Sequence, residues 1–203
     1  NAQRNDGAAP LQIVSEAASA KCVELLLANR ADPNVQDARG LTALHKAAFN
    51  CSTDCINLLL AAGADLNLQD NFGNTPFQDA ALSGSIECVK FLLRSGAGIR
   101  PSGSEGNVLH SAAPYPEITR FLIDNGAEVN GRTKFGSVPL HRAAGSSCKS
   151  LKILLDAGAE PNACDASGYT AMHYAAVADR PGNIKLLAKY GADPSIHSKE
   201  DNK

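Results

Sequence analysis

Apolar residues recur along this chain in two short clusters, and the whole pattern repeats about every 33 residues. One repeat begins GLTALHKAA and ends LLAAGADLN, so a glycine stands near each end. The leading glycines are Gly7, Gly40, Gly73, Gly106, Gly136 and Gly168. A unit of this kind predicts two short helices and a long turn, which can bury their apolar sides only by stacking on the next unit.

Residues at the ends of the clusters suit helix boundaries. Threonine offers an N-cap oxygen to the first helix at Thr42, Thr75 and Thr170. Proline fills the first helical position at Pro76 and Pro139. Left-handed glycines are expected to end the second helices at Gly63, Gly96, Gly126, Gly158 and Gly191. Arg30 takes this place in the first repeat, where a positive φ is unfavourable for a residue with a side chain.

This pattern resembles the ankyrin repeat, and the resemblance covers essentially the whole chain. It implies an all-α solenoid of stacked helix-turn-helix units with long β-turn or hairpin-like tips. We expect a single ankyrin-repeat domain over residues 1–203, with units at about 7–39, 40–72, 73–105, 106–135, 136–167 and 168–200. Residues 1–6 match the turn of a preceding repeat, and the chain stops where another would begin, so we expect a segment of a longer protein.

The fourth repeat, SEGNVLHSAAPYPEITRFL, departs from the pattern, because it lacks the Thr-Pro pair and about two residues between its helices. Pro114 should end the first helix early, and Pro116 should begin the second. Loss of the threonine cap should cost about 1 kcal/mol. Arg100 replaces a turn asparagine, so residues 98–116 are expected to be kinked and less stable, with Tyr115 exposed. Function and sequence drift both remain open as explanations.

Composition narrows the classes of function. A net charge of -2 argues against a phosphate-binding surface over the whole molecule, although a local basic patch stays possible. No apolar run approaches the ~20 residues of a membrane span, and the opening NAQRNDG is unlike a signal peptide. Cys22, Cys55 and Cys88 share one position in successive second helices, where we expect buried thiols too far apart for disulfides. Cys148 and Cys164 are expected near turns as exposed thiols, and a reducing, intracellular location follows.

Titratable residues follow the repeat and form no catalytic pattern. One slot is filled by His45, His110, His141 and His173, and the ankyrin resemblance implies that they form hydrogen bonds within and between repeats. Turn tips are marked by Asp37, Asp70 and Asp165, whose side chains should bond the local backbone. No catalytic motif or metal-ligand spacing is recognisable. We therefore expect no catalytic residues, no metal and no cofactor in this segment, which is not an enzyme by this interpretation.

Partner-binding residues are expected at the turn tips and on the inner, concave side of the first helices, as the ankyrin resemblance implies. The candidates are Arg39, Leu41, Phe49, Phe72, Tyr115, Arg132, Lys134, Phe135 and Tyr169. Aromatic and arginine side chains at solvent-facing positions are typical of binding hot spots. The alternative is that the tip aromatics pack on neighbouring tips and stiffen the row.

Three hypotheses about function follow. The leading one is a monomeric protein-interaction module in a larger intracellular scaffold, adaptor or regulatory protein, without membrane insertion. The second is nucleotide or oligonucleotide sensing, with Phe135 stacking on a base and Lys134 and Arg132 pairing with phosphate. The third is an asparagine-hydroxylation substrate, because the turn that ends at Asn67 resembles the ankyrin turn asparagine modified by an oxygen-dependent hydroxylase.

Overall fold

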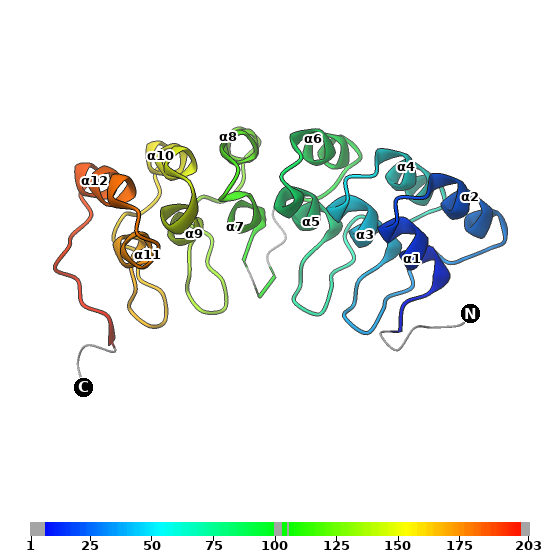
Figure 1. Cartoon of the computed structure of the whole chain (residues 1–203), viewed down its shortest axis with the longest axis horizontal. Helices are drawn as coiled ribbons and strands as arrows, with labels where there is room; N and C mark the ends of the chain where they lie inside the picture. Colours follow the sequence, from blue (N-terminus) through cyan, green and yellow to red (C-terminus); the bar gives the residue numbers. More distant parts are fainter. Residues whose placement is uncertain (1–6, 100–102, 105, 200–203) are drawn as a thin grey trace. The chain divides into compact units, whose positions relative to one another are not determined.

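The computed structural model describes residues 7–99, 103–104 and 106–199. The chain divides into two compact units, Asn1–Gly103 and Ser104–Lys203, and this boundary lies inside the segment 98–116 that the sequence singles out. Every helix belongs to a helix pair followed by a long turn, which confirms the expected all-α ankyrin-type fold (Figure 1). Arg100 lies outside the described residues.

The first unit contains three helix pairs. They are α1 (Pro10–Glu16), α2 (Ala20–Ala28), α3 (Ala43–Phe49), α4 (Thr53–Ala61), α5 (Pro76–Ser83) and α6 (Ile86–Arg94). In the layer of first helices, α3 packs between α1 and α5, and in the other layer α2 packs on α4. This arrangement sets α1, α3 and α5 in one row, and the candidate site lies among them.

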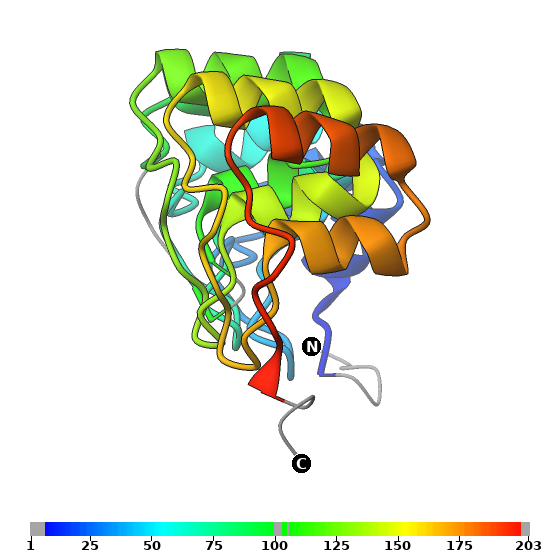
Figure 2. The same ribbon diagram turned by 90° about the vertical axis from the view of Figure 1, so that its left-hand side faces the viewer.

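The second unit repeats the same arrangement. Its helices are α7 (Val108–Ala112), α8 (Pro116–Asp124), α9 (Pro139–Ser146), α10 (Cys148–Asp156), α11 (Ala171–Val177) and α12 (Pro181–Lys189). Here α9 packs between α7 and α11, while α10 packs between α8 and α12. Figure 2 looks onto this unit and shows its two helix layers, with the long turns extending from the layer of first helices.

Small and aliphatic side chains fill the core of both units. Ala47 and Ala48 are fully buried in α3, as Ala143 and Ala144 are in α9, so adjacent first helices can approach closely. In the second helices, Leu59, Leu92 and Leu154 are fully buried. Since burying apolar surface is worth about 25 cal/mol per Å², stacking supplies the stability that an isolated helix pair lacks.

His45, His110 and His141 each link their own repeat to the next through a specific pair of hydrogen bonds. In α3 the Thr42 backbone N–H donates to His45 Nδ1 (3.1 Å), and His45 Nε2 therefore donates to the carbonyl of Asn74 (3.1 Å). His110 and His141 make the same two bonds with their own repeats and the following ones. These geometries explain the shared spacing of the histidines without a metal or catalytic role.

Turn tips are held by side-chain acceptors and by bonds between neighbouring tips. Asp70 Oδ1 accepts from the backbone N–H groups of Phe72 and Asn74, and the Asn71 N–H donates to the Arg39 carbonyl of the preceding tip. Gly40 has φ of 79°, and a Cβ there would lie 2.7 Å from the Asn71 nitrogen. Only glycine therefore allows this tip-to-tip bond.

The short fourth repeat keeps a helix cap, so the expectation of a lost cap is wrong. Asn107 is the N-cap of α7, and its Oδ1 accepts from the Leu109 N–H at 3.1 Å. Its Nδ2 also donates to the Glu128 carbonyl at 2.7 Å. Pro116 begins α8 as expected, but Tyr115 is half-buried at the N-cap of α8 rather than exposed. An asparagine amide thus replaces threonine and adds a bond to the following turn.

The cysteine prediction is correct for two of the three stacked positions. Cys55 and Cys88 are buried, whereas Cys22 is exposed, because no further helix pair packs beyond α2 in the described residues. Burial raises the pKa of the Cys88 thiol, and a hydrogen bond with the Cys51 thiol adds to this effect, so Cys88 stays protonated. Cys148 is exposed as expected, and Cys164 is half-buried.

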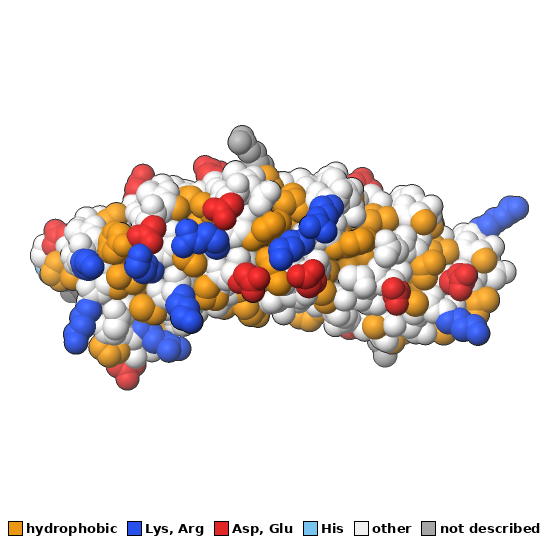
Figure 3. All heavy atoms as spheres, turned by 90° about the horizontal axis from the view of Figure 1, so that it is seen from above, with side chains coloured by type: hydrophobic (Ala, Val, Ile, Leu, Met, Phe, Trp, Pro, Cys, Tyr) orange, Lys and Arg blue, Asp and Glu red, His pale blue; other side chains and the backbone are white. Residues whose placement is uncertain are grey.

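The face formed by the second helices has a mixed surface. Figure 3 shows acidic and basic side chains interspersed with small apolar areas over these helices. Within the described ranges, no helix is long and apolar enough to cross a lipid bilayer. Exposed phenylalanines lie outside these helices, at Phe49, Phe72 and Phe135.

Candidate functional site

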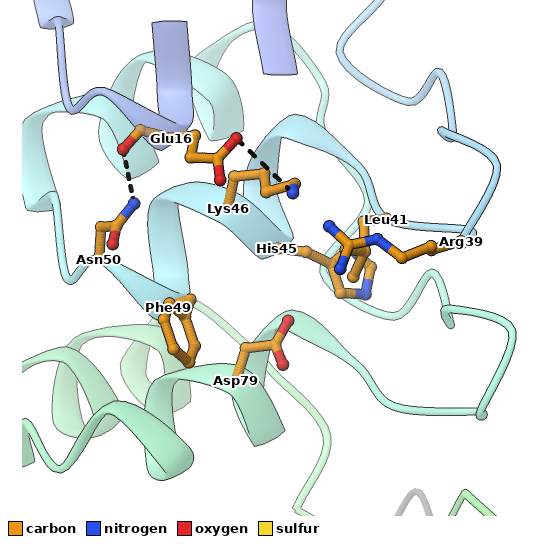
Figure 4. A pocket seen from close by; sticks show the side chains of 8 residues that line it. All are labelled: Glu16, Arg39, Leu41, His45, Lys46, Phe49, Asn50 and Asp79. Carbon is orange, nitrogen blue, oxygen red and sulfur yellow. Dashed lines mark hydrogen bonds and ion pairs between the residues drawn. The ribbon is translucent and has the colours of Figure 1, made fainter. Parts of the chain in front are cut away.

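A hollow of about 330 Å³ opens in the first unit where three successive repeats meet. We call it the Asp79 pocket. The end of α1 contributes Glu16, the α3 helix contributes Lys46 and Phe49, α5 contributes Asp79, and the preceding tip contributes Arg39 and Leu41. Figure 4 shows Phe49 and Asp79 next to each other across the gap between α3 and α5, with Arg39 reaching in from the turn.

An ion-pair arrangement fixes one side of this pocket. Lys46 Nζ lies 3.8 Å from Glu16 Oε2 and 4.0 Å from Asp37 Oδ2, and the Lys46 side chain is largely buried. Asn50 Nδ2 donates to the Glu16 carbonyl at 2.7 Å, which ties the end of α3 to the end of α1. The positive charge of Lys46 is therefore already balanced within the protein.

Asp79 presents the opposite situation. Its carboxylate forms no hydrogen bond or ion pair with the residues that the structure describes, although it is half-buried on α5. Burial raises the pKa of Asp79 to about 7, with a further rise from the charge of Asp70, while Lys46 and Arg39 oppose the shift. A half-buried carboxyl with a strongly shifted pKa in a hollow is a physical indicator of a binding site.

Aromatic side chains form a second cluster, which lies in the second unit. Tyr169, His173, Tyr174 and Val177 surround a hollow of about 270 Å³. The Tyr174 ring stacks on His141 with centroids 5.0 Å apart, and its hydroxyl donates to Asp165 Oδ2 at 2.8 Å. Burial and this hydrogen bond raise the pKa of Tyr174 to about 12, so the hydroxyl stays neutral. Val177 is 84% exposed at the edge of the cluster.

The basic residues proposed for phosphate recognition have partners within the second unit. Lys134 Nζ lies 4.8 Å from the centroid of the Phe135 ring. Arg132 Nη1 donates to the carbonyls of Gly136 and Cys164, each at 2.9 Å. Gln36 makes the equivalent two bonds in the first unit, to Gly40 and to Gln69 of the following turn. The Arg132 guanidinium thus serves as a bridge between turns.

The structure brings some of the predicted site residues together and separates others. Arg39, Leu41 and Phe49 share the Asp79 pocket, and Lys134 contacts Phe135. The phenylalanines expected at solvent-facing positions are 51% exposed at Phe49, 52% at Phe72 and 61% at Phe135. Leu41, Tyr115 and Tyr169 are half-buried, whereas Arg39, Arg132, Lys134 and Asn67 are exposed.

The sequence interpretation missed Glu16, Lys46 and Asp79. A signal for them exists, because Lys46 and Asp79 each follow the residue that fills the histidine slot, 33 residues apart. Glu16 stands 33 residues before Phe49, in the equivalent place at the end of α1. Comparing variable positions across successive repeats would have indicated a charged pocket at this site.

Among the described residues, no group of three or more histidine, cysteine, aspartate or glutamate side chains could hold a metal ion. The buried histidines have lowered pKa values, chiefly because burial disfavours their charged form, and His110 falls to about 4. Their nitrogens are occupied by the bridging bonds described above, so they are structural residues.

Comparison with protein families identifies the repeat. The family model described as ankyrin repeats (3 copies) matches residues 11–103 and 109–198. These two ranges include most of the chain, and the chain therefore belongs to the ankyrin-repeat family. Such membership supports a role in protein–protein interaction.

Individual relatives share only segments. The chain is 40% identical over 81 residues to the protein named as probable 26S proteasome regulatory subunit p28 of Saccharomyces cerevisiae, which is 38% of the chain and 35% of that protein. It is 42% identical over 52 residues to ankyrin repeat protein FPV243 of fowlpox virus, or 25% of the chain and 20% of that protein. An ankyrin repeat protein of Rickettsia bellii is 36% identical over 80 residues, covering 38% of the chain and 44% of the relative. The chain thus spans less than half of each of these relatives.

Proposed function

We propose that this chain is a protein-interaction module that binds an extended peptide or a folded domain through the inner sides of its first helices and its turn tips. The observation that carries the proposal is the exposure of three phenylalanines there, Phe49, Phe72 and Phe135, each of which presents half or more of its surface to solvent. Exposed aromatic side chains at the turn tips and at the end of a first helix favour binding over tip packing.

The proposal also concerns the setting of the module. We infer an intracellular scaffold, adaptor or regulatory protein, in which this segment acts as a monomer. The yeast relative is named as a probable regulatory subunit of the 26S proteasome, and a subunit binds other proteins, which supports an interaction role for this chain. Exposed Cys22 and Cys148, together with half-buried Cys51 and Cys164, are consistent with a reducing compartment.

A peptide selection tests the binding surface directly. A random-peptide phage library is selected on the whole chain, and enriched peptides are measured by fluorescence polarisation against two variants. Phe49→Ser with Phe72→Ser alters the first unit, and Phe135→Ser with Tyr169→Ser alters the second. We expect one of these pairs to weaken binding at least tenfold, because truncating an aromatic hot spot costs about 2 kcal/mol or more.

Leu25→Ser provides the matched control. Leu25 lies on α2 and is 55% exposed, so this variant removes an equally exposed apolar side chain from the other helix layer. Its peptide affinity should equal that of the unaltered chain. Equal peptide affinity for all of the variants would contradict the proposal that the inner sides of the first helices and the turn tips bind the peptide.

The nucleotide alternative is less well supported by the geometry. Arg132 is engaged by two backbone carbonyls, and Lys134 covers the Phe135 ring on which a base would stack. Binding of a labelled oligonucleotide that falls steeply between low and physiological salt would favour this alternative. Binding of a selected peptide should depend on salt much less.

Asparagine hydroxylation is a second candidate because the Asn67 side chain differs from its equivalents. Asn34, Asn130 and Asn162 each donate a side-chain N–H to a glycine carbonyl of the next repeat. Asn67 is exposed, and its described side-chain bond is the one that its Oδ1 accepts from Gly98 at 3.4 Å. Such an amide is accessible to an enzyme. A mass shift of one oxygen on the tryptic peptide that contains Asn67, after incubation with a protein-asparaginyl hydroxylase, tests this candidate.

A further inference from the structure

The Asp79 pocket contains a half-buried carboxylate that forms no ion pair with the residues that the structure describes. Lys46 is paired with Glu16 and Asp37, whereas the carboxylate of Asp79 has no ionic partner among the described residues. A charge held away from water costs free energy unless an opposite charge or hydrogen-bond donors accompany it. Asp79 is therefore expected to lower the stability of the free protein, while it offers a strong attraction to an incoming cation.

The groups around Asp79 suit the remainder of a basic side chain. Phe49 lies beside Asp79 in Figure 4, and about half of its surface is open to solvent. A guanidinium or ammonium group against this ring would gain a cation–π contact in addition to the ion pair. Leu41 lines the same hollow and offers apolar contact to the methylene groups of an arginine or lysine.

We propose that the Asp79 pocket binds an arginine or lysine side chain of an extended partner peptide, with Asp79 as its counter-ion and Phe49 as the ring on which it packs. This inference rests on the proposed protein-interaction function and specifies the chemistry of the partner. At about 330 Å³, the hollow is large enough for one extended side chain.

The positive charge of Arg39 favours a partner peptide that also carries an acidic residue. Its guanidinium reaches into the pocket from the exposed turn and has no ion pair within the described part of the chain. A basic side chain that enters toward Asp79 would meet this positive charge at the rim. A partner with an acidic residue close to the basic one matches both charges, because like charges in contact disfavour a complex.

The test uses the peptides selected on the whole chain, each prepared with its basic residue intact and with arginine replaced by the neutral isostere citrulline. Dissociation constants are measured for the unaltered chain, for Asp79→Asn and for the control Asp54→Asn, which changes an exposed carboxylate on α4. We expect a double-mutant cycle with Asp79→Asn and citrulline each weakening binding about tenfold, and with little further loss when combined. Asp54→Asn should leave the affinity unchanged.

Unfolding of the variant is not an explanation for a loss of affinity, because Asp79→Asn removes a half-buried charge and is expected to stabilise the chain. A second readout is the ¹³C NMR titration of the Asp79 carboxyl, whose pKa should fall when a basic peptide binds and should not change with its citrulline form. Peptides that depend on Phe49 but tolerate both citrulline and Asp79→Asn would overturn the inference and leave the proposed function intact. Failure to select any peptide that distinguishes the phenylalanine variants would count against the proposed function itself.

Discussion

Asp79 and Tyr174 occupy the same place in their repeats, directly after the residue in the histidine slot, yet the two units use this place differently. In the first unit, Asp79 borders an open pocket and its carboxylate lacks an ionic partner among the described residues. In the second unit, Tyr174 stacks on His141 and donates its hydroxyl to Asp165. Tyr174 therefore interacts with other residues of its own unit, whereas Asp79 is available to interact with a binding partner.

This difference distinguishes residues that stabilise the stacking of repeats from residues that are available to a binding partner. Histidine bridges between repeats and buried pairs of alanines occur in both units, because each repeat must stack on its neighbour. The residue after the histidine slot is half-buried at Asp79 and at Tyr174, and its contacts differ between the two units. An unpaired carboxyl at such a place contributes nothing evident to the fold, which favours a role in binding.

The largest expected effect is at Tyr174. Tyr174→Ala should lower the free energy of unfolding by about 2 kcal/mol, because it removes a stacked ring and a hydrogen bond. Tyr174→Phe keeps the ring on His141 and should cost only about 1 kcal/mol. Urea denaturation followed by circular dichroism measures both values. Equal stability of all three proteins would show that the tyrosine is not part of the internal packing and would remove the contrast with Asp79.

The same measurement on Asp79 should give the opposite sign. Asp79→Asn is expected to raise the free energy of unfolding at pH 7.5 by roughly 1–2 kcal/mol, because the folded carboxyl has its pKa raised from 3.8 to about 7. Solvent screening at this half-buried position reduces the effect from the full linkage value of about 4 kcal/mol. The unfolded chain releases this proton at lower pH than the folded chain, so the carboxyl destabilises the fold increasingly as pH rises from about 4 to about 7.

The pH dependence supplies the control for this prediction. The gain from Asp79→Asn should shrink as the pH is lowered from 7.5 toward 4, where the carboxyl is protonated in the folded chain. The charged neighbours Asp70, Lys46 and Arg39 are retained in both proteins, so their own effects cancel in the difference. A gain that is independent of pH would mean that the substitution acts through packing instead of charge.

A third prediction compares the two residue types that fill the histidine slot. Gln78 in the first unit accepts from the Thr75 N–H, as His110 accepts from the Asn107 N–H in the second. Burial lowers the pKa of His110 from 6.5 to about 4, so its contribution is fully present above pH 6.5 and is lost as pH falls toward 4. His110→Gln should therefore remove roughly 1–2 kcal/mol of acid sensitivity between pH 7 and pH 5, measured as the difference between the free energies of unfolding from urea titrations at these two pH values. An unchanged difference would contradict the assigned cause.

Much of the fold could be read from the sequence, because a 33-residue spacing constrains many positions at once. The proline starts, the left-handed glycines and the shared histidines are each repeated, and each has a physical reason that acts inside one repeat. Asn107 was misjudged because the rule for caps was applied to threonine alone, although asparagine caps a helix equally well.

The candidate site was less predictable, since it depends on contacts between successive repeats. Phe49 and Arg39 could be placed on the surface by their position in one repeat. That Asp79 lies beside Phe49, and that Lys46 turns toward Glu16 and Asp37, follows from how α1, α3 and α5 stack. A rule that treats each repeat separately does not contain this information.

The smallest expected effect on stability concerns Phe49. Because Phe49 is 51% exposed and stands at the edge of the pocket, Phe49→Ser should change the free energy of unfolding by no more than about 0.5 kcal/mol. Leu25→Ser, at a similarly exposed position on α2, should behave alike and sets the scale for a surface substitution. A loss near that expected for Tyr174→Ala would instead mean that Phe49 supports the stack of α3 on α5. A small change for Phe49→Ser would mean that folding does not need the Phe49 ring, while the neighbouring Asp79 carboxyl opposes folding. Both properties are expected of residues that bind a partner, so the first unit would present a binding pocket where the second unit packs internally.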